Sequence, residues 1–114
     1  MSGRRRASGL GPPETLLLRS WGSALLHAFG ATPYLVGSVA RAEEWRDVDV
    51  RLMLPQATID GLSADRPGQL AALNLSVSLW GQRATGLPVE FQFQEVESAN
   101  AEHAGPRIPI VLAP

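Results

Sequence analysis

The stretch Asp47-Val48-Asp49-Val50-Arg51-Leu52-Met53-Leu54 alternates between two sets of side chains. A period of two residues is typical of a β-strand, in which successive side chains point to opposite faces of a sheet. Pro55 cannot donate a ladder hydrogen bond, so the strand is expected to end there. The pattern predicts a strand whose one face is buried in the core, while its other face carries Asp47, Asp49 and Arg51.

A second alternating stretch runs from Leu87 to Gln94 and is predicted to be another strand of the same sheet. Its inward face would carry Leu87, Val89, Phe91 and Phe93, and its outward face Glu90. A short apolar strand is predicted over 33–36, where it runs into Gly37-Ser38. Residues 98–114 are expected to form either an edge strand or a loop packed on the core.

Helices are predicted between these strands. Apolar residues recur at helical spacing over 14–29 and from about residue 66 to residue 84, the second helix with Asp65 as N-cap and Trp80 in its buried stripe. A short helical turn is expected over 38–44, and a loop or broken helix over 55–67. This order predicts a small α/β (α+β) domain with a mixed sheet of three to four strands and helices packed mainly on one face.

Length and composition limit the class of protein. The chain has 114 residues, a formal charge of −1 and no cysteine. It is expected to form a disordered basic tail over 1–13 and one domain over 14–114. The absence of cysteine excludes disulfides and thiolate chemistry. No apolar run is long enough for a membrane span, and Arg4–Arg6 precede no apolar signal segment, so a cytoplasmic protein is predicted.

Two acidic residues share the polar face of the first strand. Strand geometry separates the Cα atoms of Asp47 and Asp49 by roughly 6.5–7 Å. Two ionised carboxylates at that spacing repel one another, and a divalent cation such as Mg²⁺ relieves the repulsion. The alternative is a solvated polar face on which Arg51 pairs with Asp49.

Two further features are predicted to lie near this acid pair. Gly37 allows a phosphate to approach the backbone, and Ser38, at the start of a helical turn, can donate a hydrogen bond to a phosphate oxygen. Glu90 on the neighbouring strand would add a third carboxylate to a two-metal site. The alternatives are an ordinary strand-to-helix turn with Ser38 as N-cap and a solvated Glu90. No role is assigned to His103.

Three motifs occur in a fixed order: Val36-Gly37-Ser38, then Asp47-x-Asp49 after a spacer of eight residues, then Glu90 on a later strand. This order resembles the nucleotidyltransferase superfamily typified by DNA polymerase beta, in its minimal form. The spacer is one residue shorter than in the family, and the third acid of the family is usually Asp. In the segments 45–51 and 86–94 the chain is similar to small nucleotidyltransferase-like proteins carried by actinobacterial phages.

The resemblance implies transfer of a nucleoside monophosphate from a nucleoside triphosphate to a hydroxyl acceptor, with Mg²⁺ or Mn²⁺ as cofactor. By the same resemblance, the metal ligands and catalytic residues are Asp47, Asp49 and Glu90, and the nucleotide is held by Gly37, Ser38 and Arg41. The alternative is a catalytically silent nucleotide- or protein-binding module of the same fold. A phage-encoded chain would act in the host cytoplasm. No helix is predicted to cover the polar face, so a second copy or a partner protein is expected to complete the site.

Overall fold

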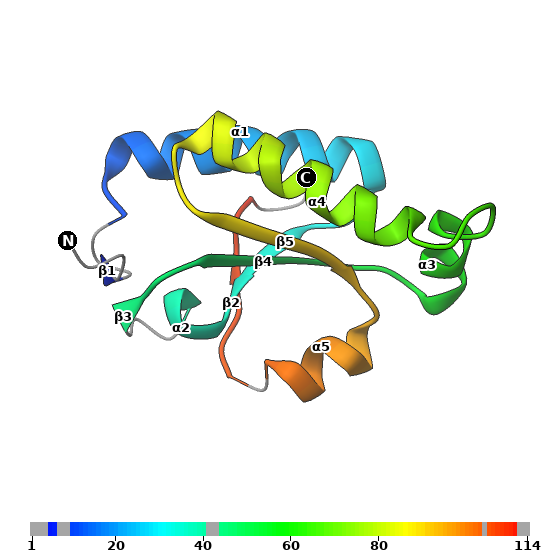
Figure 1. Cartoon of the computed structure of the whole chain (residues 1–114). Coiled ribbons are helices and arrows are strands. Elements are labelled where there is room, and N and C mark those ends of the chain that lie inside the picture. Colours follow the sequence, from blue (N-terminus) through cyan, green and yellow to red (C-terminus); the bar gives the residue numbers. More distant parts are fainter. Residues whose placement is uncertain (1–4, 7–9, 41–43, 104, 112–114) are drawn as a thin grey trace.

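A computed structural model of the chain describes residues 5–6, 10–40, 44–103 and 105–111 (Figure 1). Helices and strands are interspersed along the sequence, in agreement with the predicted α+β class. In chain order they are β1 (Arg5–Arg6), α1 (Pro12–Phe29), β2 (Pro33–Val36), α2 (Gly37–Ala40), β3 (Glu44–Trp45), β4 (Val48–Met53), α3 (Gln56–Leu62), α4 (Gln69–Thr85), β5 (Val89–Gln94), α5 (Val96–Glu102) and β6 (Ile108–Pro109). None of the helices in these ranges combines the length and apolar content needed to cross a bilayer.

Four strands form a central mixed sheet in the order β5-β4-β2-β6, and β1 pairs separately with β3. β2 is antiparallel to β4 and to β6, whereas β4 and β5 are parallel. Two parallel neighbouring strands must be joined by a crossover rather than by a tight turn. The segment that contains α3 and α4 forms this crossover between β4 and β5. The mixed sheet confirms the prediction, and β6 is the edge strand that was one of two alternatives for the C-terminal segment.

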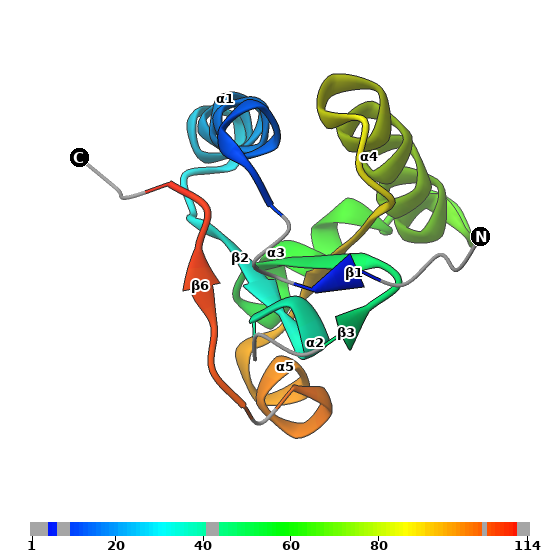
Figure 2. The same cartoon turned by 90° about the vertical axis from the view of Figure 1, so that its left-hand side faces the viewer.

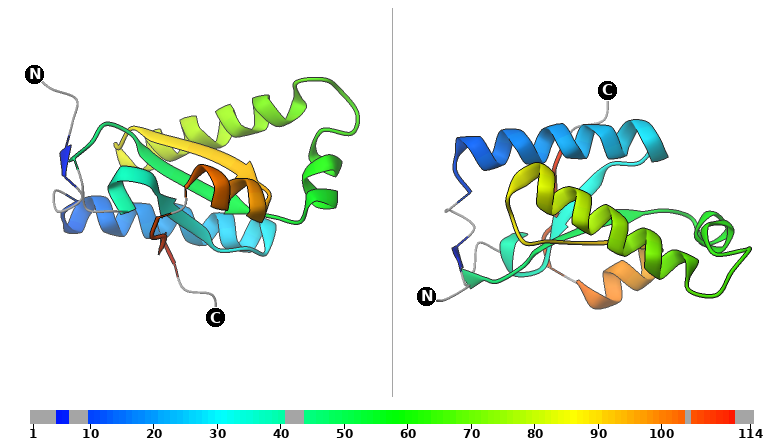
Figure 3. Two further views of the ribbon diagram at one scale, coloured as in Figure 1. Left: turned by 90° about the horizontal axis from the view of Figure 1, so that it is seen from below. Right: turned by 45° about the horizontal axis from the view of Figure 1, so that its top comes forward.

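The sheet has helices on both faces (Figures 1 and 2). α1 and α4 lie side by side on one face, as predicted. α5 lies on the other face, and in the view from below it passes in front of β4 and β5 (Figure 3). The expectation that no helix covers the polar face is therefore wrong. Residues 96–102 can form this helix because the Glu95 side chain caps it by accepting hydrogen bonds from the backbone N–H groups of Glu97 and Ser98.

The core fills the space between the sheet and the α1–α4 layer. The inward side chains of β4 and β5 are almost fully buried there, which confirms both predicted alternations. Trp21 of α1 packs edge-to-face on Phe91, with ring centroids 6.1 Å apart. A Cβ at Gly81 would lie 2.7 Å from the Trp21 ring, so α4 approaches α1 closely because this position has no side chain. The buried strand residues are Val48, Val50, Leu52, Val89, Phe91 and Phe93.

Helix α4 differs in two respects from the helix predicted there. Gly68, not Asp65, is the N-cap residue, and its left-handed φ of 82° suits a glycine. Trp80, predicted to be buried, is 44% exposed and only touches the edge of Trp21, because the neighbouring Gly81 occupies the contact with α1. The loop or broken helix expected over 55–67 contains the short helix α3.

The ends of the chain differ in how much of them the structure describes. Of the tail predicted over 1–13, residues 1–4 and 7–9 lie outside the described residues, Arg5–Arg6 pair with Glu44–Trp45, and α1 begins at Pro12. Near the other end, Ile110 is buried against Gly22 of α1 and donates its backbone N–H to Pro33 at 3.0 Å. The segment after α5 therefore closes one side of the core.

Candidate functional site

Asp49 and Glu90 stand side by side in the middle of the polar face. They are register partners on the parallel strands β4 and β5, so their side chains leave the sheet on the same side. The Glu90 carboxyl is close enough to act on Asp49 and is one of the causes that raise the pKa of Asp49. Asp47 precedes β4 and is exposed, but its charge also acts on Asp49. Asp49 and Glu90 are therefore neighbours on this face, and Asp47 lies just before the start of β4.

The turn after β2 lies against Asp49. Val36, the last residue of β2, is the register partner of Asp49, and Gly37 follows with a left-handed φ of 70°. A Cβ at Gly37 would lie 2.8 Å from Asp49 Oδ2, closer than side chains pack. Gly37 is thus required both by its backbone conformation and by the approach of a carboxylate. Ser38 comes next, half-buried in the single turn α2.

The Asp49 carboxyl is held in an environment that disfavours its charge. Burial is the largest cause, and it raises the pKa of Asp49 to about 6 together with the hydrogen bond to Glu90 and the charges of Glu90 and Asp47. The positive charge of Arg51 acts in the opposite direction. A bound cation would lower the pKa of Asp49, because the cation favours the ionised form of the carboxyl.

Arg51 is the buried centre of an ion-pair network on this face. Only 2% of the residue is exposed, and its Nη2 donates to Glu90 Oε2 at 3.0 Å and to Glu102 Oε1 at 3.3 Å. Its Nη1 donates to the backbone oxygens of Val50 and Glu90 at 3.0 and 3.2 Å. The predicted alternative that Arg51 forms an ion pair with Asp49 is wrong: the carboxylates that it pairs with are Glu90 on β5 and Glu102 on α5.

The second oxygen of Glu90 is also engaged. Gln92 Nε2 donates to Glu90 Oε1 at 2.9 Å, so each carboxylate oxygen of Glu90 accepts from a neighbouring side chain. Gln94 of β5 donates to Glu102 of α5 at 3.1 Å, and this bond, followed by the contact with Arg51, lowers the pKa of Glu102. These contacts fasten α5 to the sheet beside the acids.

His103, which follows α5, reaches the same turn. Its Cε1 and Nδ1 atoms lie 3.7 Å from the position that a Gly37 Cβ would occupy. Its Nε2 lies 2.9 Å from Glu102 Oε1, but without the geometry of a hydrogen bond, and it has no hydrogen-bond partner among the described residues. The side chain is 15% exposed. The imidazole thus fills the space between α5 and the Gly37 turn.

The donor set fits a divalent cation in part. No group of three or more His, Asp or Glu side chains within the described ranges is arranged to hold a metal ion. Mg²⁺, however, typically takes one or two carboxylates and completes its shell with substrate phosphates and water. The adjacent carboxyl groups of Asp49 and Glu90 offer two such ligands, and the charge of Asp47 also acts on Asp49.

Of the six residues predicted for the site, the structure places Gly37, Asp49 and Glu90 next to one another, with Ser38 following Gly37 along the chain and Asp47 exposed just before β4. Arg41, predicted to bind phosphate, lies outside the described residues. Sequence reasoning missed Glu102 and His103, because residues 98–114 were not predicted to be helical. The available signal was Glu95, an acidic residue placed to cap a short segment that contains two alanines and two glutamates.

Comparison with protein-family models, with curated proteins and with solved structures found no match to this chain.

Proposed function

We propose that the protein is a nucleotidyltransferase that moves a nucleoside monophosphate from a nucleoside triphosphate to a hydroxyl acceptor. The observation that supports it is the placement of the carboxyl groups of Asp49 and Glu90 side by side, with the Gly37 turn in contact with Asp49. An acid pair beside a glycine turn is an arrangement suited to a metal-bound triphosphate. The order of these motifs along the chain matches the superfamily that the sequence resembles.

Each residue has a role in this proposal. When bound, Mg²⁺ or Mn²⁺ would supply positive charge to the carboxylates and to the reacting phosphate. Asp47 and Asp49 would hold the cation, and Ser38 would donate to a phosphate oxygen. Glu90 would bind on the acceptor side and accept the hydroxyl proton. The acceptor oxygen then forms a bond to the α-phosphorus, the bond to the β-phosphate oxygen breaks, and pyrophosphate leaves.

The second candidate is a catalytically silent module that binds a nucleotide or a protein through the same face. The contacts of Glu90 favour it, because both carboxylate oxygens already accept hydrogen bonds, from Arg51 and Gln92. These contacts occupy part of the acceptor capacity of Glu90, and the positive charge of Arg51 beside it disfavours a bound cation. In the silent module, a second copy or a partner protein would complete the site.

Transfer assays separate the two candidates. Each labelled nucleoside triphosphate would be incubated with the protein, Mg²⁺ or Mn²⁺ and an actinobacterial lysate, and pyrophosphate release and the destination of the label would be measured. We expect Glu90→Gln to abolish transfer but leave triphosphate binding nearly intact. Glu97→Gln, an exposed residue of α5, is the matched control and should change neither. Nucleotide binding without pyrophosphate release under every condition would favour the silent module.

A further inference from the structure

β5 is an outer strand of the central sheet and has a neighbouring strand, β4, on one side only. Leu54 N–H donates to Gln94 O at 3.1 Å, so the even-numbered residues of β5 direct their backbone groups at β4. The backbone groups of the odd-numbered residues point away from the sheet. These residues are Val89, Phe91 and Phe93. Outward N–H and C=O groups of this kind are a template for a further strand.

The sequence of β5, Val-Glu-Phe-Gln-Phe-Gln, is of a kind that pairs readily with a copy of itself. Valine and phenylalanine alternate with polar residues, Glu90 is the one charged residue, and proline, glycine and lysine are absent from the strand. Segments of about six residues with high β-propensity, low charge and no proline pair with one another when their edges are open. An open β5 edge would therefore take the β5 strand of a second copy as its partner.

Two side chains of α4 accept the outward N–H groups of β5. Ser78 Oγ accepts from Phe91 N–H at 2.8 Å, and its own hydrogen lies within reach of the backbone oxygens of Asn74 at 2.8 Å and of Phe91 at 3.3 Å. Asn74 Oδ1 accepts from Phe93 N–H at 2.9 Å. Ser78 is 7% exposed, so this contact takes place in a buried setting, where an N–H without an acceptor is costly.

The outward groups of Val89 are occupied as well. Gln82 Nε2 of α4 donates to Val89 O at 3.0 Å, and Val89 N–H donates to Leu87 O at 2.8 Å. Each of the three outward N–H groups of β5 thus has an acceptor within this chain. No outward N–H of this strand is left to donate to a new strand.

The spacing of the polar residues along α4 matches the spacing of their partners along β5. Residues 74, 78 and 82 recur every four positions and so lie on one face of the helix. Four helical residues advance about 6 Å, and two strand residues advance about 6.5 Å, so successive contacts stay in register. α4 follows β5 in this way along the edge (Figures 1 and 3).

The contacts are made by side chains that reach across a gap. A groove of about 370 Å³ lies between α4 and β5 and is lined by Asn74, Ser78 and Gln82 together with residues of the strand. The backbone of α4 therefore does not fill the space beside β5. We call these three side chains the polar ladder.

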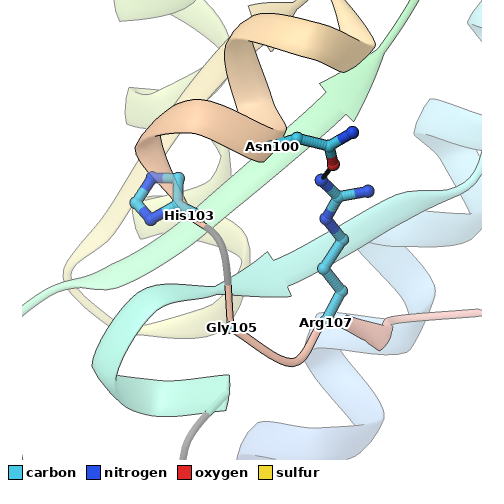
Figure 4. A pocket seen from close by; sticks show the side chains of 4 residues that line it. All are labelled: Asn100, His103, Gly105 and Arg107. Carbon is cyan, nitrogen blue, oxygen red and sulfur yellow. Dashed lines mark hydrogen bonds between the residues drawn. The ribbon is translucent and has the colours of Figure 1, made fainter.

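The opposite edge of the sheet, β6, is protected by other features. It is two residues long and follows a pocket between α5 and the sheet. That pocket is lined by Asn100, His103, Gly105 and Arg107 (Figure 4). Ile110 N–H donates to Pro33 O, so Ile110 faces β2 and Pro109 faces outward. Proline has no N–H, so the outward residue of β6 offers no donor to another strand.

We propose that the polar ladder guards the β5 edge and prevents the β5 strand of a second copy from extending the sheet. The guard governs how copies of the chain can assemble and is independent of any reaction at the polar face. A second copy or a partner at the candidate site would then bind to a face of the sheet and not to its β5 edge.

Removal of the polar ladder tests the guard. The triple variant Asn74→Ala, Ser78→Ala, Gln82→Ala leaves the outward N–H groups of β5 without side-chain acceptors, while alanine favours the helix. In sedimentation velocity over a range of concentrations, we expect its self-association to be at least about tenfold tighter than that of the wild type, because the freed N–H groups find acceptors in a second strand. Ser76→Ala is the matched control and should behave as the wild type, since this exposed serine donates to Ala72 O within α4.

Amide hydrogen exchange shows whether the association uses the β5 edge. In the dilute triple variant the amides of Phe91 and Phe93 should exchange at least about tenfold faster than in the wild type, and they should become protected again as the concentration rises. If circular dichroism shows that the triple variant is unfolded, Ser78→Ala alone should accelerate exchange at Phe91 more than at Phe93, and Ser76→Ala should accelerate neither.

Three results would overturn the proposal. The first is a folded triple variant that stays as monomeric as the wild type. The second is association in which the Phe91 and Phe93 amides continue to exchange fast, because the copies would then meet through another surface. The third, decisive where the triple variant does not fold, is equal exchange at Phe91 in Ser78→Ala and Ser76→Ala.

Discussion

The two faces of the central sheet are built from the same two strands but are stabilised in different ways. On the α1–α4 side, β4 and β5 present only apolar side chains, which are buried together. On the α5 side, the same strands present the side chains of Asp49, Arg51, Glu90, Gln92 and Gln94, and the last four form hydrogen bonds or ion pairs with one another or with Glu102 of α5. The stability of the first face depends on the buried apolar area, whereas that of the second depends on individual hydrogen-bonded and charged partners.

This difference determines what each face can do. Apolar burial contributes stability in proportion to area and tolerates many combinations of side chains of similar size. A buried ion pair contributes little net stability, because desolvation offsets most of its attraction, but the loss of one partner is costly. The polar face is therefore poorly suited to hold the fold together and well suited to hold charged groups at fixed positions.

The largest effect is expected from the apolar face. Phe91 is 1% exposed and packs edge-to-face on Trp21 and Phe93. Phe91→Ala should lower the free energy of unfolding by about 3–5 kcal/mol, since it removes the ring and leaves a cavity. Urea denaturation measures the change. Gln92→Ala, one residue along on the other face, should cost less than about 1 kcal/mol. Equal losses for the two variants would contradict the comparison.

Removal of Arg51 should have a smaller but distinct effect. Arg51→Met retains much of the side-chain volume but leaves Glu90 and Glu102 without their shared cation. We expect a loss of about 2 kcal/mol in the free energy of unfolding, moderated because Glu90 is 42% exposed. Adding Glu90→Gln to this variant should restore part of the loss. If Arg51→Met is as stable as the wild type, the network does not contribute to the stability of the polar face.

The Ser38→Ala variant tests whether the turn beside the polar face binds a phosphate group. Ser38→Ala should weaken triphosphate binding by about 1–2 kcal/mol, the range of one hydrogen bond to a charged group. Adenosine should bind the variant and the wild type alike. Isothermal titration with the two ligands measures both. An equal loss for adenosine would instead indicate that the turn itself has changed shape.

The smallest effect concerns the pH dependence of stability. Because the pKa of Asp49 is raised to about 6 in the folded protein, the folded state retains a proton that the unfolded state releases near pH 4. Stability contributed by this group therefore falls as pH rises from about 4 to 6 and stays lower above that range.

Asp49→Asn removes the titration and should be more stable than the wild type by about 1 kcal/mol at pH 7, after allowance for solvent screening. At pH 4 the two proteins should be equally stable. Urea midpoints at both pH values test this expectation. A variant that is less stable than the wild type at pH 7 would mean that the carboxylate is needed to hold the fold.

The apolar face was predictable in detail, and the polar face only in part. Strict alternation in β4 and β5 identified the buried residues, because the period of a strand is a local property. The gathering of Asp49 and Glu90 was also expected, since two neighbouring strands with polar outward faces place their side chains together. Trp80 was assigned wrongly because helical spacing indicates a stripe but not which residue within it meets the next helix. In α4 the residue that faces α1 is Gly81, and the Trp21 ring packs directly against it.

The sequence by itself determined the order of the elements, the apolar face of the sheet and the acids that share the opposite face. These features follow from periods of two and of about 3.6 residues, which depend only on local backbone geometry. Only the tertiary structure decided that α5 folds over the polar face, that Arg51 pairs with Glu90 and Glu102, and that Asp49 stands against Gly37. Such contacts join residues far apart in the chain, and their partners depend on strand order and register, which no local pattern contains.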